Sequence, residues 1–199
     1  MKATFVLLAN NDLENYAKKL VLKAQNIGKL GFEACRLPFH VSLKQPFDIP
    51  NIDSIEKYFD SFVKTIKPVT IHFTELDLYK ANIMGNDSGV LSIKAEKTRQ
   101  LDELQKKLFT ELNEKFGDCK ADHDDDYVFH MTICYGLAPS EQYDKVFNEL
   151  KAHNYNFESV FSQLGLFYYE DFKPGAYFCY KKQILFKTDV LNVYSKKIL

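Results

Sequence analysis

The sequence of 199 residues lacks the patterns that mark several classes of protein. Its four cysteines form no CxxC pair and no short repeating interval, so we expect neither a zinc knuckle nor a disulfide scaffold, and we expect a cytoplasmic location. No apolar run approaches the roughly 20 residues that span a bilayer. The short apolar run near the N-terminus is followed by no A-x-A cleavage pattern, and we interpret it as a first strand. These absences argue against a membrane partner.

An excess of charge of one sign is also missing. The chain has 26 Lys plus Arg against 27 Asp plus Glu, a formal net charge of -1, and its only arginines are Arg36 and Arg99. Duplex DNA calls for a broad cationic surface, so this balance argues against it as a partner. A small basic cleft around one or two phosphates remains compatible with the composition. We therefore expect a nucleic-acid partner to be a small nucleotide or an RNA end.

Nothing in the sequence divides the chain into separate parts. There is no tract rich in Pro, Gly and Ser, no low-complexity segment and no coiled-coil heptad run. A chain of this length buries roughly 70% of the surface that its unfolded form exposes, so it needs neither a disulfide nor a metal to hold a core. We expect a single monomeric domain over residues 1–199.

Hydrophobic periodicity predicts an α+β protein. Apolar residues at helical spacing, with capping residues at the ends, predict helices at residues 11–28, 53–67, 101–116 and from 140 onward. Alternating or continuous apolar runs predict strands at residues 4–9, 37–44, 69–79, 90–95, 127–135, 157–169 and 177–187. The glycines and polar residues at 85–89 predict a hairpin turn, so the sheet cannot be all-parallel.

The most informative feature is an internal echo between residues 39–43 and 129–133. Both segments read apolar, His, apolar, hydroxyl, apolar, with His40 and Ser42 in the first and His130 and Thr132 in the second. Side chains alternate between the two faces of a strand, so each segment presents an imidazole and a hydroxyl on one face. Apolar neighbours on the other face would hold them in place.

Two imidazoles and two hydroxyls suit chemistry at a phosphodiester. Displacement at phosphorus needs a base on the attacking oxygen and an acid on the leaving oxygen, and histidine serves both roles near neutral pH. The hydroxyls can donate hydrogen bonds to the non-bridging phosphate oxygens, where negative charge develops in the transition state. This scheme requires neither a metal nor another cofactor.

With its two His-x-Ser/Thr motifs, each on a predicted strand and one in each half of the chain, the sequence resembles the two-histidine (2H) phosphoesterases. This superfamily includes 2′-5′ RNA ligase-like and cyclic-nucleotide phosphodiesterase proteins. The resemblance implies two pseudo-symmetric lobes, each an antiparallel sheet flanked by helices, with the active-site groove between them. It also implies that His40 and His130 form the acid/base pair and that Ser42 and Thr132 donate to phosphate oxygens.

The resemblance implies hydrolysis of a 2′,3′-cyclic phosphate or a related phosphodiester, and several points stay open. Either histidine can be the base, and attack by a neighbouring hydroxyl would use the same residues. A 2′-5′-oligoadenylate phosphodiesterase and a non-catalytic nucleotide-binding module are the alternatives. The absence of a G-x-S-x-G elbow argues against a serine hydrolase.

Further residues around the two motifs are candidates for the site. Lys44 extends the first polar face by two residues and Cys134 extends the second, so Lys44 is a candidate phosphate contact and Cys134 a weak candidate nucleophile. Tyr135 is a candidate for stacking on a base. Residues 122–126 read Asp-His-Asp-Asp-Asp, but their spacing does not match a calcium-binding loop. We therefore expect a solvated loop there rather than a metal site.

Overall fold

The computed structural model describes residues 1–121, 123–169 and 178–185. The α-helices are α1 (Asn11–Gly28), α2 (Ile52–Phe62), α3 (Arg99–Phe116) and α4 (Ser140–Leu150), and short 3-10 helices lie at Glu33–Arg36 and Val63–Thr65. The strands are β1 (Lys2–Leu8), β2 (His40–Ser42), β3 (Phe47–Asp48), β4 (Val69–Ile83), β5 (Asn86–Ala95), β6 (His130–Tyr135), β7 (Phe157–Phe161), β8 (Gln163–Tyr169) and β9 (Phe178–Ile184). This confirms the predicted α+β class. None of the described helices combines the length and the apolar character that a bilayer-spanning helix needs.

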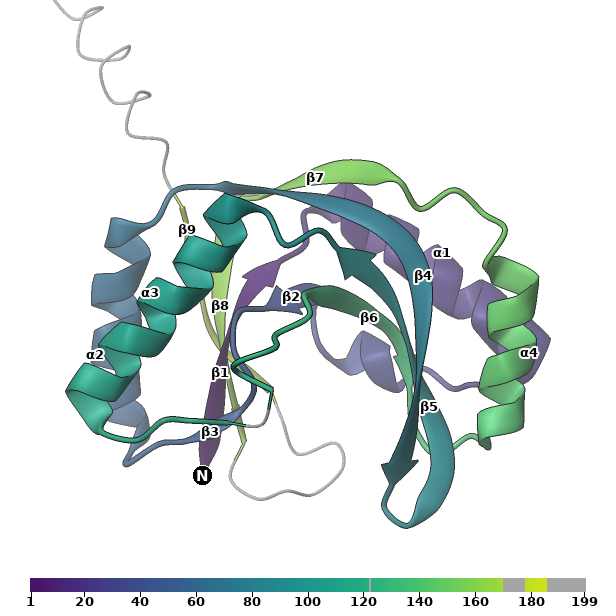
Figure 1. The fold of residues 1–199 in the computed structure, drawn as a ribbon, viewed down its shortest axis with the longest axis horizontal. Helices are drawn as coiled ribbons and strands as arrows, with labels where there is room; N and C mark the ends of the chain where they lie inside the picture. Colours follow the sequence, from purple (N-terminus) through teal and green to yellow (C-terminus); the bar gives the residue numbers. More distant parts are fainter. Residues whose placement is uncertain (122, 170–177, 186–199) are drawn as a thin grey trace, which may run out of the picture.

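All the described strands belong to one curved antiparallel sheet (Figure 1). The strand order is β7-β4-β5-β6-β2-β1-β8-β9, and β3 pairs with β1. The resemblance implied an antiparallel sheet in each of two lobes, and in the structure the strands of both halves are hydrogen-bonded into one sheet. The junction between the halves is the pairing of β2 with β6, in which Val41 lies opposite Met131. The two His-x-Ser/Thr motifs thus lie on the strands that join the sheet together.

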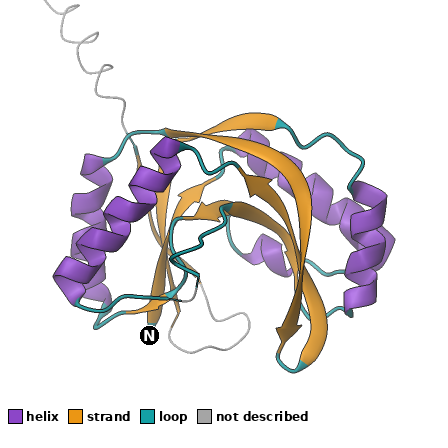
Figure 2. Ribbon diagram, in the orientation of Figure 1, coloured by secondary structure: helices purple, strands orange, loops and turns teal. Residues whose placement is uncertain are grey.

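The helices form two pairs at opposite ends of the sheet (Figure 2). Helices α1 and α4 pack against each other, α1 also on β6 and α4 on β4 and β5. The other pair covers the β1 side, where Phe5 packs against three aromatic side chains of α2, Tyr58, Phe59 and Phe62. Tyr58 also donates a 3.0 Å hydrogen bond to Glu111 of α3. The helices cover one face of the central strands, so they do not bury the opposite face.

Helix α1 spans the predicted residues 11–28, and its two ends show what fixes them. Its N-cap is Asn10, whose side chain accepts a 2.9 Å hydrogen bond from the amide of Leu13. Gly28 is the last helical residue, and Lys29 takes the left-handed conformation after it, with φ of 56°. A Cβ on Gly28 would collide with Val146 of α4. The glycine is therefore required for close helix packing rather than for the cap.

The hairpin turn and two strands also differ from the sequence prediction. The turn is made by Met84 and Gly85, with φ of 54° and 82°, because two positive φ values match the twist of a two-residue hairpin. Residues 86–89 accordingly belong to β5. The predicted strand at 157–169 breaks at Ser162, because β7 pairs with β4 and β8 pairs with β1. Of the predicted strand at 177–187, residues 177, 186 and 187 lie outside the described residues.

Candidate active site

The pairing of β2 with β6 brings the two motifs side by side. With Val41 opposite Met131 in an antiparallel pair, His40 lies opposite Thr132 and Ser42 lies opposite His130. Val41 and Met131 are fully buried on the core side, so the four polar side chains share the other face. Directly opposite Cβ atoms are roughly 4.5–5.5 Å apart and diagonal positions roughly 7–8 Å. The two histidines occupy a diagonal of this four-residue group, a spacing that suits a phosphate between them.

The two imidazoles are held in the same way. His40 Nδ1 lies 2.8 Å from the carbonyl oxygen of Pro38, and His130 Nδ1 lies 2.9 Å from that of Val128. A carbonyl oxygen can only accept, so each Nδ1 carries the hydrogen and donates it. This assigns the tautomer of both neutral rings and leaves each Nε2 with a lone pair. Both histidines therefore offer Nε2 for proton transfer.

The surroundings of His40 favour its neutral form. Burial lowers the pKa of His40 to about 4; the hydrogen bond to Pro38 opposes this shift, and the charge of His130 adds to it. The ring of Phe167 meets the imidazole edge-on, with 4.7 Å between the ring centres. Phe167 belongs to a small apolar cluster with Val6 and Leu8 beside the two motifs. His40 is thus a neutral acceptor through the neutral pH range.

The β5 side of the four-residue group is polar. By register, Ser92 of β5 lies opposite Thr132 and Lys94 lies opposite His130. The Ser92 hydroxyl is buried and has no hydrogen-bond partner in the described part of the chain. The ring of Tyr79, on β4, lies 6.1 Å from the ring of His130. The sequence prediction missed these three residues, because alternation within a strand does not reveal which strands become neighbours.

The structure corrects the expected position of Lys44. Regular pairing of β2 ends at Ser42, so the alternation no longer continues to Lys44, whose side chain is only 1% exposed. Its ammonium forms a buried ion pair with Asp124 and lies over the rings of Phe47 and Phe109, 5.4 and 5.0 Å from their centres. Lys44 therefore does not extend the polar face beside His40.

Asp124 belongs to the acidic run at residues 122–126. It pairs with Lys44 and also accepts a 2.8 Å hydrogen bond from the amide of Ala121. Among the residues that the structure describes, which exclude Asp122, no group of three or more His, Cys, Asp or Glu side chains could hold a metal ion. At least one carboxylate of the run therefore serves to hold the loop against the end of β2.

A β-bulge in β6 places Cys134 differently from the sequence prediction. Leu91 pairs with Cys134 and Ser92 with Thr132, so Ile133 is an extra residue on β6 and the alternation shifts after it. Cys134 is consequently buried on the core side, and burial raises the pKa of its thiol to about 12. It is not a nucleophile facing the histidines. Tyr135 ends β6 half-buried, opposite Val90, on the same face as the motifs by register.

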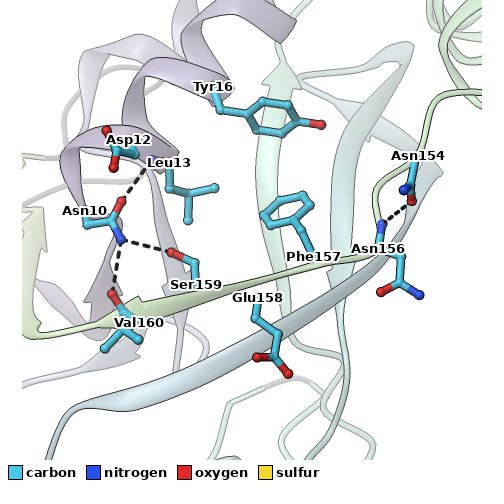
Figure 3. Close-up of a pocket in the computed structure, with 10 residues that line it drawn as sticks. All are labelled: Asn10, Asp12, Leu13, Tyr16, Asn154, Asn156, Phe157, Glu158, Ser159 and Val160. Carbon is cyan, nitrogen blue, oxygen red and sulfur yellow. Dashed lines mark hydrogen bonds between the residues drawn. The ribbon is translucent and has the colours of Figure 1, made fainter.

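A separate cavity of about 530 Å³ is lined by none of the motif residues (Figure 3). It is formed by the start of α1, the strand β7 and the segment before it, with Tyr16 and Phe157 packed edge to face. The Asn10 amide closes one side by donating to the Ser159 hydroxyl and the Val160 carbonyl. None of the ten lining residues is a histidine, lysine or arginine. This cavity therefore lacks the groups that phosphodiester chemistry requires.

Comparison with known proteins places this geometry in context. Residues 17–172 match the model of a family described as the 2′-5′ RNA ligase superfamily. A candidate phosphoesterase of Staphylococcus saprophyticus is 28% identical over 134 residues, which cover 66% of this chain and 72% of that protein. A crystal structure of a Thermus thermophilus protein has a TM-score of 0.65 at 15% identity, covering 93% of this chain and 98% of that one. E. coli LigT complexed with 3′-AMP has a TM-score of 0.57 at 11% identity, covering 94% and 98%. At these identities the two solved structures show a shared fold.

Proposed function

The chain belongs to the 2′-5′ RNA ligase superfamily, and we propose that it is a metal-independent phosphodiesterase that hydrolyses a nucleoside 2′,3′-cyclic phosphate or a related phosphodiester at an RNA end. The family match and the Staphylococcus relative support a phosphoesterase-type function. The observation that carries the finer proposal is the pair of histidines on one face, each with Nδ1 bonded to a carbonyl and Nε2 left for the substrate.

The proposal assigns different roles to the two histidines. His40, whose pKa is lowered to about 4, is the general base that takes a proton from water. The water oxygen forms a new bond to phosphorus while the bond from phosphorus to one ribose oxygen breaks. His130 gives a proton from Nε2 to that departing oxygen and acts as the general acid. The histidines then exchange protons with solvent to restore the starting state.

The hydroxyls complete the group. Ser42 and Thr132 donate hydrogen bonds to the non-bridging oxygens, on which negative charge grows as water attacks. Hydroxyl donors and an imidazole pair supply charge stabilisation and proton transfer without a Lewis acid. A 2′-5′-linked oligoadenylate would present the same phosphodiester to these four residues, so it is the alternative substrate. A nucleotide-binding module without turnover is the alternative outside catalysis.

A substrate panel in EDTA tests the proposal. We expect hydrolysis of 2′,3′-cyclic nucleotides, with slower or no hydrolysis of 2′-5′ dinucleotides, in the presence of the chelator. Faster cleavage of the dinucleotides would favour the oligoadenylate alternative. Tight binding of a nucleotide without hydrolysis of any substrate would favour the binding module. Activity that is lost in EDTA and returns with a divalent cation would contradict the metal-independent mechanism.

A further inference from the structure

An acidic flank borders the motifs on the His130 side. We use this name for Glu75, Asp77 and Lys94, on β4 and β5. Lys94 Nζ lies 3.1 Å from a Glu75 oxygen and 3.4 Å from an Asp77 oxygen, so one ammonium is shared by two carboxylates. The register places Lys94 opposite His130 and Asp77 opposite Ser92. The flank therefore carries an excess of one negative charge close to the proposed general acid.

Tyr79, on β4, is close both to Asp77 of this flank and to His130. Its ring centre is 6.1 Å from that of His130, with 46° between the ring planes, and the residue is 39% exposed. Burial raises the pKa of the Tyr79 phenol and the nearby Asp77 carboxylate raises it further, so the phenol keeps its proton at neutral pH. An aromatic ring that is held at one edge and open at the surface suits stacking with a nucleobase.

The described residues beside His40 present a different surface. There, Val6, Leu8 and Phe167 pack on one another and are at most 2% exposed. A nucleoside attached to the oxygen that leaves toward His130 Nε2 lies nearest to β5 and β4, the strands that adjoin β6 on that side. That side presents Tyr79 and the acidic flank.

We propose that Tyr79 stacks on the base of the nucleoside that carries the leaving oxygen, and that the acidic flank makes the site prefer a 5′-hydroxyl on this nucleoside over a 5′-phosphate. This rests on the proposed phosphodiesterase function and narrows its substrates to mononucleoside cyclic phosphates. Stacking contributes because every base has a flat face, so the site should tolerate different bases. The flank discriminates because like charges repel at short range.

The stacking part is tested with two substrates that differ only in the base. Adenosine 2′,3′-cyclic phosphate carries it, and methyl ribofuranoside 2′,3′-cyclic phosphate does not. We expect Tyr79→Leu to raise KM for the adenosine substrate by about tenfold or more, as the loss of one base–aromatic stack implies, with kcat little changed. KM for the base-free substrate should not change, and Tyr79→Phe should behave as wild type because the ring remains.

The charge part is tested by adding a 5′-phosphate to the adenosine substrate. Wild type should have a higher kcat/KM for the 5′-hydroxyl form. The double variant Glu75→Gln, Asp77→Asn leaves the Lys94 ammonium unbalanced, so its preference should reverse toward the 5′-phosphate. Glu103→Gln, which removes an exposed carboxylate paired with Arg99 on α3, is the matched control and should keep the wild-type preference.

The outcomes separate the two levels of the proposal. If wild type hydrolyses both the adenosine and the base-free substrate with equal kcat/KM, and Tyr79→Leu does the same, the stacking role is wrong while the phosphodiesterase stands. An unchanged preference in the double variant would overturn the role of the flank. If wild type hydrolyses none of these substrates, the proposed function itself fails, and the subsite fails with it.

Discussion

His40 and His130 are held by equivalent hydrogen bonds, each from Nδ1 to the carbonyl oxygen of the residue two positions earlier in the chain. Because each of these bonds lies within its own short segment, each motif positions its own imidazole. The pairing of β2 with β6 then brings the two imidazoles onto one face. The equivalence ends with their surroundings, since an apolar cluster borders His40 and the acidic flank borders His130.

Replacing either histidine should abolish most of the turnover. We expect His40→Asn and His130→Asn each to lower kcat by about 10² to 10⁴, because each removes one proton-transfer group. His153→Asn is a matched control at an exposed histidine outside the site and should leave kcat unchanged. Near-normal turnover in either motif variant, with the fold intact by circular dichroism, would contradict the acid/base pair.

The hydroxyls should matter less than the imidazoles. Ser42→Ala and Thr132→Ala each remove one donor to a phosphate oxygen, so we expect kcat/KM to fall by about tenfold. Proton transfer stays intact in both variants, so the shape of the pH profile should not change. A loss as large as that of the histidine variants would mean that the hydroxyls do more than donate to the phosphate.

The pH dependence of kcat/KM should show an unusually low acid limb. This parameter reports the free enzyme, in which the base His40 has its pKa lowered to about 4. The rate should therefore hold down to about pH 5 and fall only as His40 becomes protonated near pH 4. An acid limb close to the ordinary histidine pKa of about 6.5 would contradict the assignment of His40 as the base.

The lowered pKa of His40 should also make the unfolding free energy depend on pH. His40 binds a proton near pH 6.5 when unfolded but only near pH 4 when folded, so its contribution is complete above pH 6.5 and is lost as the pH falls toward 4. A pKa shift of this size corresponds to about 3 kcal/mol of unfolding free energy for a fully buried group. The partial exposure of the His40 side chain reduces this value. Urea unfolding at several pH values should show that wild type loses more stability than His40→Asn over this range. Parallel curves for the two proteins would contradict the shift.

The buried pair of Lys44 and Asp124 should behave as a unit. Lys44→Met leaves the Asp124 carboxylate buried without its partner, so we expect the unfolding free energy to fall by about 3–5 kcal/mol. The double variant Lys44→Met, Asp124→Leu removes both charges and should recover most of that loss. Urea unfolding measures the stability of each variant. If the loss in the double variant equals the sum of the losses in Lys44→Met and in Asp124→Leu, the pair is not coupled.

Local patterns in the sequence were sufficient for much of this protein. The echo of His40 and Ser42 in His130 and Thr132 led to the family, which the match over residues 17–172 confirms. Helical spacing and strand alternation predicted the α+β class and the four α-helices, because burial of one face imposes a period that a single segment can show. The catalytic roles of the four motif residues stay predictions.

Contacts between distant segments decided the rest. Strand order joined the sheet at Val41 and Met131, and the bulge at Ile133 turned Cys134 into the core. Lys44 pairs with Asp124, 80 residues away in the chain, because a buried ammonium needs a counter-charge that the strand itself does not provide. Tyr79 came to lie beside His130 through the pairing of β4, β5 and β6. Alternation is a property of one strand, whereas register and neighbours are set by the packing of the whole chain, so only the tertiary structure could show which residues surround the motifs.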